Sequence, residues 1–165
     1  MAGVTGEAFQ DQMVGNFCWG CGAANPAGLH LKSYWDGEVA VAQWTPSADY
    51  AAGPRHFLNG GIIATLLDCH GVCTGVASAY RRERREIGSD PEIWYATVSM
   101  SIEYLRPTPI DEAVHLRARP MADEDRVTSV ECALEAAGKE RARAVVRATR
   151  VPEEWRHGTT GSSQR

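Results

Sequence analysis

Residues 59–68, with the sequence NGGIIATLLD, combine two kinds of group that could act on a carbonyl compound. Gly60 and Gly61 are expected at the start of a helix, where backbone N–H groups lack intrahelical partners and the helix dipole is positive. A carbonyl oxygen or an oxyanion placed there would be stabilised. Asp68 follows two turns later on a stripe of small residues, where a carboxylate is unlike its neighbours. Periodicity alone favours a structural interpretation, in which the glycines turn the chain and Asp68 pairs with a backbone group.

A second group of residues, Cys18-Trp19-Gly20-Cys21, has the spacing of metal ligands or of a redox motif. A zinc site needs about four ligands, and the nearest candidates are Cys69 and Cys73, one helical turn apart, with His70 adjacent. The two pairs can converge only if the N-terminal loop folds over the helix. The βαβ pattern that a thioredoxin-type motif requires is absent. We therefore expect a tight turn in which the small thiols pack, with no metal and no cofactor.

The helix that carries Asp68 is expected from residue 60 to about residue 85. Its apolar-leaning face consists of Ile62, Ile63, Leu66, Leu67 and His70. Its second stripe consists of Gly61, Ala64, Asp68, Gly71, Gly75 and Ala79. A helix loses about 1 kcal/mol for each glycine relative to alanine. We therefore expect something to approach the backbone closely along this stripe.

Six strands are expected around this helix. Residues 29–35 and 38–44 flank Asp36-Gly37, a strong signal for a tight hairpin turn. Residues 94–105 alternate in polarity, which predicts a strand covered on the side of Val98, Met100, Ile102 and Tyr104. Three further strands are expected at residues 113–119, 126–136 and 141–150, joined by short turns at 122–125 and 137–139. Strands that follow a single helix favour an α+β domain in which an antiparallel sheet wraps one helix.

Composition limits the classes of function. The 165 residues are 44% apolar and 23% charged, which favours one soluble domain, here residues 1–155. Residues 1–15 and the tail at 156–165 are expected to be loosely ordered. The net charge of −4 supplies no basic field for nucleic acid. With no apolar run near about 20 residues and no signal-peptide pattern, we expect a cytoplasmic protein without membrane association. Five cysteines, an odd number, argue against a disulfide framework.

Three stretches of the sequence carry a family resemblance: NGGIIATLLD, YATVSMSIEYLRPTP and the opening CWGCGAANPAGLHL. The first two resemble hotdog-fold acyl-CoA thioesterases of the phenylacetate-degradation type, whose signature is His-Gly-Gly, four variable residues, Leu, one residue and Asp. The third is similar to a leader in one branch of the same superfamily. The resemblance covers roughly residues 16–150 and implies the hotdog fold.

The resemblance also implies catalytic roles. Asp68 matches the catalytic carboxylate, which acts as a general base on water or as a nucleophile toward the thioester carbonyl. Gly60 matches the glycine whose backbone N–H forms the oxyanion hole, and Thr97 matches a position that helps to place the attacking water. Asn59 stands where the family usually has histidine, so it can orient the thioester but cannot transfer a proton. His56 is the candidate to replace that function.

The expected substrate-binding residues are Gly61, His56, Arg55 and Arg106. The arginines, together with the cluster at residues 81–85, are candidates for pairing with coenzyme A phosphates. Trp44 and Tyr50 bracket the loop before the helix and are candidates for lining an acyl pocket.

The resemblance implies a homodimer, in which the catalytic helix of one subunit faces the Thr97 strand of the other, and it allows dimers to pair into tetramers. The leading hypothesis is an acyl-CoA thioesterase. The alternatives are an acyl-carrier-protein thioesterase in a biosynthetic pathway and a non-catalytic hotdog protein that binds an acyl thioester.

Overall fold

The computed structural model describes residues 6–121 and 126–156. Its strands are β1 (Ser33–Asp36), β2 (Val39–Trp44), β3 (Tyr95–Tyr104), β4 (Val114–Pro120), β5 (Val127–Ala136) and β6 (Lys139–Arg150). The helical elements are η1 (Ala48–Tyr50), the long α1 (Gly60–Arg82) and the short α2 (Glu153–Arg156).

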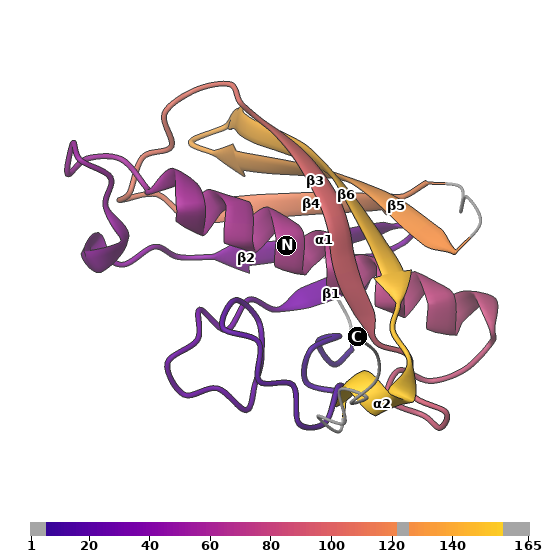
Figure 1. The fold of residues 1–165 in the computed structure, drawn as a ribbon. Coiled ribbons are helices and arrows are strands. Elements are labelled where there is room, and N and C mark those ends of the chain that lie inside the picture. Colours follow the sequence, from indigo (N-terminus) through magenta and orange to yellow (C-terminus); the bar gives the residue numbers. More distant parts are fainter. Residues whose placement is uncertain (1–5, 122–125, 157–165) are drawn as a thin grey trace, which may run out of the picture.

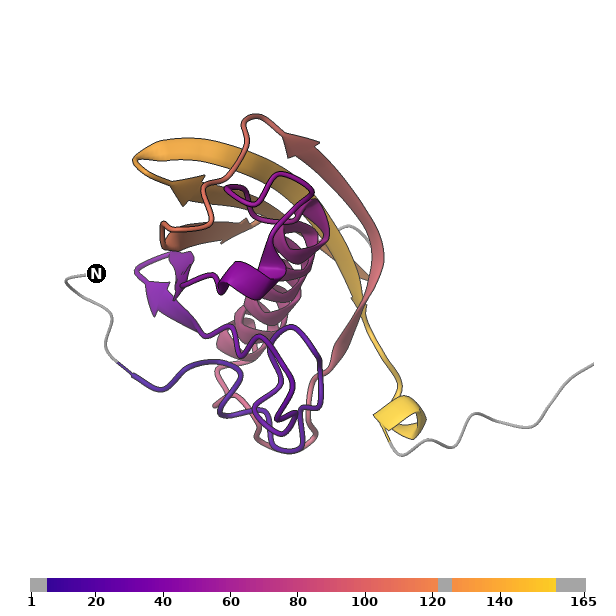
Figure 2. The ribbon, with the colours of Figure 1, turned by 90° about the vertical axis from the view of Figure 1, so that its left-hand side faces the viewer.

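The strands form one antiparallel sheet in the order β1-β2-β4-β5-β6-β3. This sheet curls around α1, and the N-terminal segment (residues 6–32) lies along another side of the helix (Figures 1 and 2). The arrangement is the α+β hotdog fold, so the expected fold class is confirmed. The expected turn at 122–125 and all but the first residue of the expected tail lie outside the described residues.

Helix α1 begins and ends on local signals. Asn59 is its N-cap, and Arg81 and Arg82 lie in its last turn, where cations suit the helix dipole. By length and composition α1 could also cross a membrane, since one 18-residue window has a mean hydropathy of 1.4. However, 72% of that window is buried inside the protein. The helix is thus more apolar than expected, since no apolar run near about 20 residues was predicted. Its packing in the protein core accounts for its apolar composition.

The small residues of α1 allow the sheet to approach its backbone. A Cβ at Gly71 would lie 2.7 Å from the Val146 Cγ2 on β6, closer than real Cβ contacts allow. At Gly75 a Cβ would touch the Tyr95 ring on β3 at 3.5 Å. The close approach predicted from the glycine spacing is therefore confirmed for this half of the helix.

Strand β3 differs from its expected pattern. It lies at one edge of the sheet, and its register with β6 shifts between Thr97 and Ser99. Val98 and Tyr104, both expected on the covered face, are 52% and 53% exposed, whereas Met100 and Ile102 are partly buried. The irregular register and the edge position leave much of this strand open.

The N-terminal segment is more ordered than expected. Phe9 and Met13 belong to the core, and the Phe9 ring packs on Trp35 with centroids 5.1 Å apart. Residues 29–32, expected within the first strand, instead pair with a turn of this segment, through Leu29 N–H to Trp19 O at 2.8 Å. For residues 6–15 the expectation of loose structure is wrong, because their apolar side chains fill the open side of the fold.

Candidate active site on helix α1

The start of α1 is organised by Asn59. Its backbone N–H donates to Tyr50 O at 2.9 Å, and its side-chain Oδ1 accepts from the Gly61 N–H at 2.7 Å. The Gly60 N–H has no acceptor among the described residues, so it is available to a ligand. Two expectations change as a result. Asn59 acts as a helix cap through its oxygen, and the Gly61 N–H is already used by that cap.

Tyr104 completes this end of the helix. Its hydroxyl donates to the Gly60 carbonyl oxygen at 2.8 Å, and a Cβ at Gly60 would lie 3.5 Å from the ring. In the sequence, Tyr104 stands out only as one of the alternating apolar residues of its strand. Its position just before Leu105-Arg106-Pro107, part of the family-like stretch, was the available signal.

Asp68 and Thr97 form the second half of the site. The Thr97 hydroxyl, on β3 beside the register shift, donates to the Asp68 Oδ1 at 2.7 Å. Burial raises the pKa of the half-buried Asp68 carboxyl, and the Thr97 hydrogen bond opposes that shift. The resemblance placed the Thr97 strand of the other subunit against the catalytic helix, yet this bond joins Thr97 and Asp68 of the same chain. One oxygen of the carboxylate is thereby held, which fixes the direction of the other.

The helix start at Gly60 and the Asp68–Thr97 pair lie far apart within one chain. Asp68 follows Gly60 by eight residues on one continuous helix, which corresponds to about 12 Å along the axis at 1.5 Å per residue. An oxyanion donor must lie within about 3 Å of the carbonyl oxygen that it stabilises. This separation is too long for the Asp68 carboxylate to attack directly a thioester carbonyl whose oxygen is held by Gly60 of the same chain.

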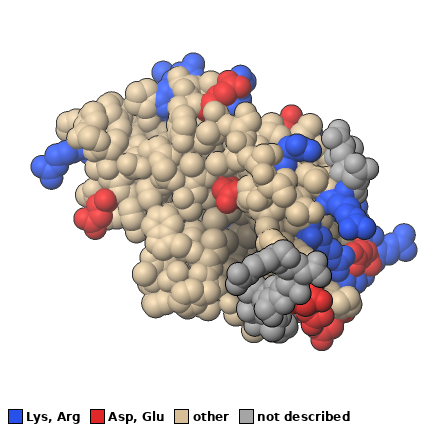
Figure 3. All heavy atoms as spheres, viewed as in Figure 1, with Lys and Arg blue, Asp and Glu red and all other residues tan. Residues whose placement is uncertain are grey.

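The stripe of α1 residues that runs from Gly61 to Asp68 is accessible to solvent. Gly61 is exposed, while Ala64, Thr65 and Asp68 are half-buried, in contrast to the buried residues on the other sides of the helix. Seen from the direction of Figure 1, the surface over this half of α1 is largely uncharged apart from one acidic side chain near its centre (Figure 3). The carboxylate and the helix start thus belong to a weakly charged open face and not to a closed pocket.

The predicted binding residues are only partly brought to this face. Arg55 and His56 are exposed in the loop before α1, and neither side chain hydrogen-bonds to Asp68 or Thr97 in the described structure. The Arg106 guanidinium donates to the Glu140 carbonyl oxygen on β6 at 3.0 Å. It is therefore tied to the sheet.

The other arginine and aromatic candidates also have structural contacts. Arg81 stacks over the Trp35 ring at 3.9 Å, and the Arg85 guanidinium donates to the Pro91 carbonyl oxygen. Trp44 and Tyr50 pack on each other with ring centroids 5.6 Å apart. Tyr50 thereby lies close to the cap of α1, since its carbonyl accepts from the Asn59 N–H.

Two hollows of the single chain lie elsewhere. One, of about 610 Å³, lies near the end of α1 and includes Arg82, Tyr95 and Arg150 in its lining. The other, of about 620 Å³, lies over β4, β5 and β6. Neither is lined by Gly60, Asp68 or Thr97. The candidate site is therefore defined by its hydrogen bonds and chemistry and not by a hollow of the chain.

No protein-family model and no curated protein matches this sequence. Solved structures do match it. A thioesterase superfamily protein from Shewanella loihica is 34% identical, with 74% of this chain and 91% of that chain covered and a TM-score of 0.59. The PaaI protein from the phenylacetic acid degradation operon of Escherichia coli is 15% identical, with 75% and 81% covered and a TM-score of 0.60. A Streptococcus mutans protein bound to acetyl-CoA is 17% identical, with 71% and 84% covered and a TM-score of 0.56.

Proposed function

Because this chain belongs to the thioesterase superfamily, we propose that it is an acyl-CoA thioesterase whose active site forms between two copies of the chain. In one route Asp68 takes the proton of a water molecule that adds to the thioester carbonyl. In the other route Asp68 attacks the carbonyl itself, and water then hydrolyses the acyl-Asp68 anhydride. In both routes the Gly60 N–H stabilises the developing oxyanion, the carbon–sulfur bond breaks, the leaving thiolate takes up a proton that comes from water, and the products are a free acid and coenzyme A.

The separation of Gly60 and Asp68 along α1 carries the proposal of a shared site. A two-fold axis passing beside Ala64, midway between them, would place Gly60 of one copy opposite Asp68 of the other. The intervening residues Gly61, Ala64 and Thr65 are small enough for two antiparallel helices to approach closely. The weakly charged open face over this half of α1 supports the same contact.

Three further residues support these roles. Thr97 holds one oxygen of Asp68, so the other oxygen can face the water or the carbonyl. Asn59 and Tyr104 fix the first turn of the helix through Gly61 and Gly60. Asn59 acts here by capping the helix, which does not require the proton transfer that a histidine could supply.

Coenzyme A is the thiol that we propose for the substrate. The Streptococcus mutans relative is bound to acetyl-CoA, and several related structures carry thioesterase names. A carrier-protein thioester is the alternative acyl donor. A panel of acyl-CoAs and acyl-carrier proteins with a thiol reagent separates the two, whereas tight binding of every thioester without release of thiol would overturn the enzyme assignment.

Mixed dimers test the shared site. Gly60→Pro removes only the N–H at the first helical position, where proline is tolerated, and Asn59 already has the extended backbone (φ −62, ψ 135) that precedes proline. Asp68→Asn removes the base and keeps the oxygen that accepts from Thr97. Each variant alone is expected to be nearly inactive on the best acyl-CoA of the panel.

Co-expression of the two variants provides the decisive measurement. Each mixed dimer would contain one intact site, with Gly60 from the Asp68→Asn chain and Asp68 from the Gly60→Pro chain. Random pairing makes half of the dimers mixed, so we expect about a quarter of wild-type activity in a two-fold dimer. Activity equal to the mean of the two single variants would refute the shared site while leaving thioesterase activity itself intact.

A further inference from the structure

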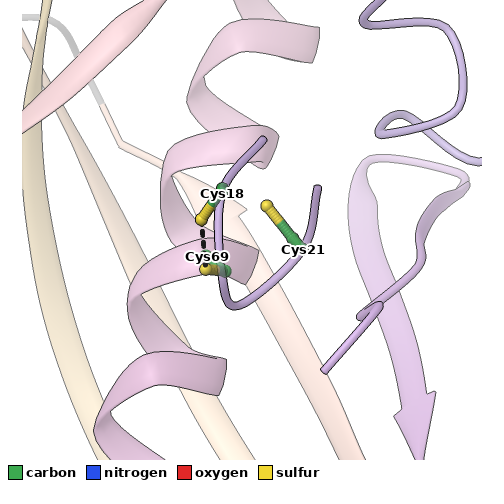
Figure 4. Close-up of side chains that lie close together, drawn as sticks. All are labelled: Cys18, Cys21 and Cys69. Carbon is green, nitrogen blue, oxygen red and sulfur yellow. Dashed lines mark hydrogen bonds between the residues drawn. The ribbon is translucent and has the colours of Figure 1, made fainter. Parts of the chain in front are cut away.

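Four of the five cysteines meet where the N-terminal segment crosses α1. Cys18 and Cys21 lie on one turn, and Cys69 and Cys73 lie one helical turn apart on α1. The sulfur atoms of Cys18 and Cys69 are 3.7 Å apart, and those of Cys21 and Cys73 are 3.8 Å apart. Those of Cys18, Cys21 and Cys69 all lie within 4.8 Å of one another, and the Cys73 sulfur joins this group through its contact with Cys21. Figure 4 shows the turn lying across the helix, with the Cys18 sulfur directed at Cys69 and Cys21 beside it.

The turn can lie this close only because of its glycines. A Cβ at Gly20 would overlap the Cys69 sulfur and come within 2.7 Å of the Thr65 methyl group. A Cβ at Gly22 would overlap the backbone nitrogen of Cys18, and the Gly22 N–H closes the turn by donating to Cys18 O at 2.8 Å. The backbone is thus shaped to bring two thiols onto the helix.

Asn16 supports both cysteines of the turn. Its side chain is buried, with 4% of the residue exposed. Its Oδ1 accepts from the Cys18 N–H at 3.1 Å, and its Nδ2 lies 3.8 Å from the Cys21 sulfur as a donor. Amide donors of this kind orient thiolate ligands and offset their negative charge in metal sites.

We propose that Cys18, Cys21, Cys69 and Cys73 bind a structural zinc ion. Tetrahedral zinc with bonds of about 2.3 Å to sulfur holds its ligand sulfurs about 3.8 Å apart, close to the two sulfur–sulfur distances quoted above. The C-x2-C spacing of the first pair is that of structural zinc sites. The loop folds over the helix, so the condition for convergence is met, and the proposal departs from the expectation of packed thiols without a metal.

Four protein ligands would close the coordination shell of the ion. A closed site has no position for water or substrate, so the zinc holds structure and takes no part in hydrolysis. The ion would fasten the N-terminal segment, which has no helix or strand between residues 6 and 32, to the helix that carries Asp68. Its binding free energy would then contribute to folding.

The fifth cysteine provides a matched control. Cys132 is buried on β5, 4% exposed, and its sulfur lies 4.0 Å from the Val130 carbonyl oxygen. Unlike Cys73, it makes no sulfur contact with Cys18, Cys21 or Cys69 in the described part of the chain. Cys132→Ser therefore removes a buried thiol without removing a ligand.

The test begins with the wild-type full chain, purified under reducing conditions without a metal-binding tag or chelators. We expect roughly one zinc ion per chain by elemental analysis and an X-ray absorption spectrum with about four sulfur neighbours near 2.3 Å. Exchange with Co²⁺ should give the strong visible absorption of a tetrahedral thiolate site. These measurements do not depend on hydrolysis, so they test the zinc proposal independently of the thioesterase proposal.

Variants then assign the ligands. Cys18→Ser and Cys73→Ser should lower the zinc content at least about tenfold, whereas Cys132→Ser should keep it at the wild-type value. Three outcomes would overturn the proposal: metal-free wild-type protein that binds neither Zn²⁺ nor Co²⁺, a Cys18–Cys69 or Cys21–Cys73 disulfide in protein kept under reducing conditions, or an absorption spectrum dominated by oxygen and nitrogen neighbours. If a serine variant fails to fold, the wild-type measurements still decide.

Discussion

The hydrogen bond between Thr97 and Asp68 makes a quantitative test of the catalytic assignment possible. Thr97→Val has nearly the same shape and removes the only group that donates to the Asp68 Oδ1 in the described structure. A hydrogen bond to a charged group contributes about 1.5–3 kcal/mol, which corresponds to about a 10- to 150-fold fall in kcat at about 1.36 kcal/mol per factor of ten. We expect KM to change little, because Thr97 acts on the carboxylate and not on the bound acyl group.

Asp68→Asn supplies the second arm of a double-mutant cycle. Its amide oxygen can still accept from Thr97, so the fold around the site should survive while the base is lost. Loss of a general base lowers kcat by about 10²- to 10⁴-fold. If Thr97 works by holding the carboxylate, adding Thr97→Val to Asp68→Asn should lower kcat no further.

The assay follows thiol release from an acyl-CoA at saturating substrate, for the wild type, both single variants and the double variant. Thr97→Ser keeps a hydroxyl group and should restore most of the activity lost in Thr97→Val. Equal fold-losses from Thr97→Val in the wild-type and Asp68→Asn backgrounds would refute the positioning role, because independent effects multiply. A rise in KM with unchanged kcat would point instead to substrate binding.

Three further predictions concern single contacts. Gly60→Ala keeps the N–H and should retain activity, whereas Gly60→Pro should lower kcat about 10²- to 10³-fold in the thiol-release assay. Gly71→Ala should lower the free energy of unfolding by about 1–3 kcal/mol in urea, because its Cβ would lie 2.7 Å from a Val146 methyl group and 3.1 Å from the Cys132 sulfur. Gln10→Ala should lower the free energy of unfolding in urea by about 1–3 kcal/mol. The buried Gln10 side chain accepts a hydrogen bond from the Ser33 N–H and donates one to the Ser33 hydroxyl oxygen.

Local signals in the sequence determined the main elements. The predicted helix at residue 60 to about 85 matches α1 because an asparagine cap, an apolar period and terminal arginines all act within a few residues. The Asp36-Gly37 turn was predicted for the same reason, since Gly37 adopts the positive φ of 62° that the turn requires. Asn59 both caps α1 and stands at the histidine position of the family motif, and only the first of these roles is visible in the hydrogen bonds of the helix start.

Contacts between distant segments could not be predicted in this way. The Thr97–Asp68 bond depends on the register shift in β3, which the alternating sequence does not reveal. The Tyr104–Gly60 bond spans 44 residues. The cysteine pairs are separated by 51 and 52 residues, and their meeting depends on how an N-terminal segment without helix or strand lies on the helix.

The distribution of small residues on α1 is explained only when each side of the helix is considered separately. Gly71 and Gly75 face the sheet, where Val146 leaves no room for a Cβ at Gly71 and the Tyr95 ring is in van der Waals reach of a Cβ at Gly75. The side that carries Cys69 lies against Gly20 of the N-terminal turn. Along the remaining stripe, at residues 61, 64, 65 and 68, the side chains are small yet open in the described part of the chain. Since the other two sides show that small residues here accompany close approach, the open stripe favours an approach from outside the chain. The second copy of α1 in the proposed dimer would fit that requirement and would also bring Gly60 within reach of a carboxylate.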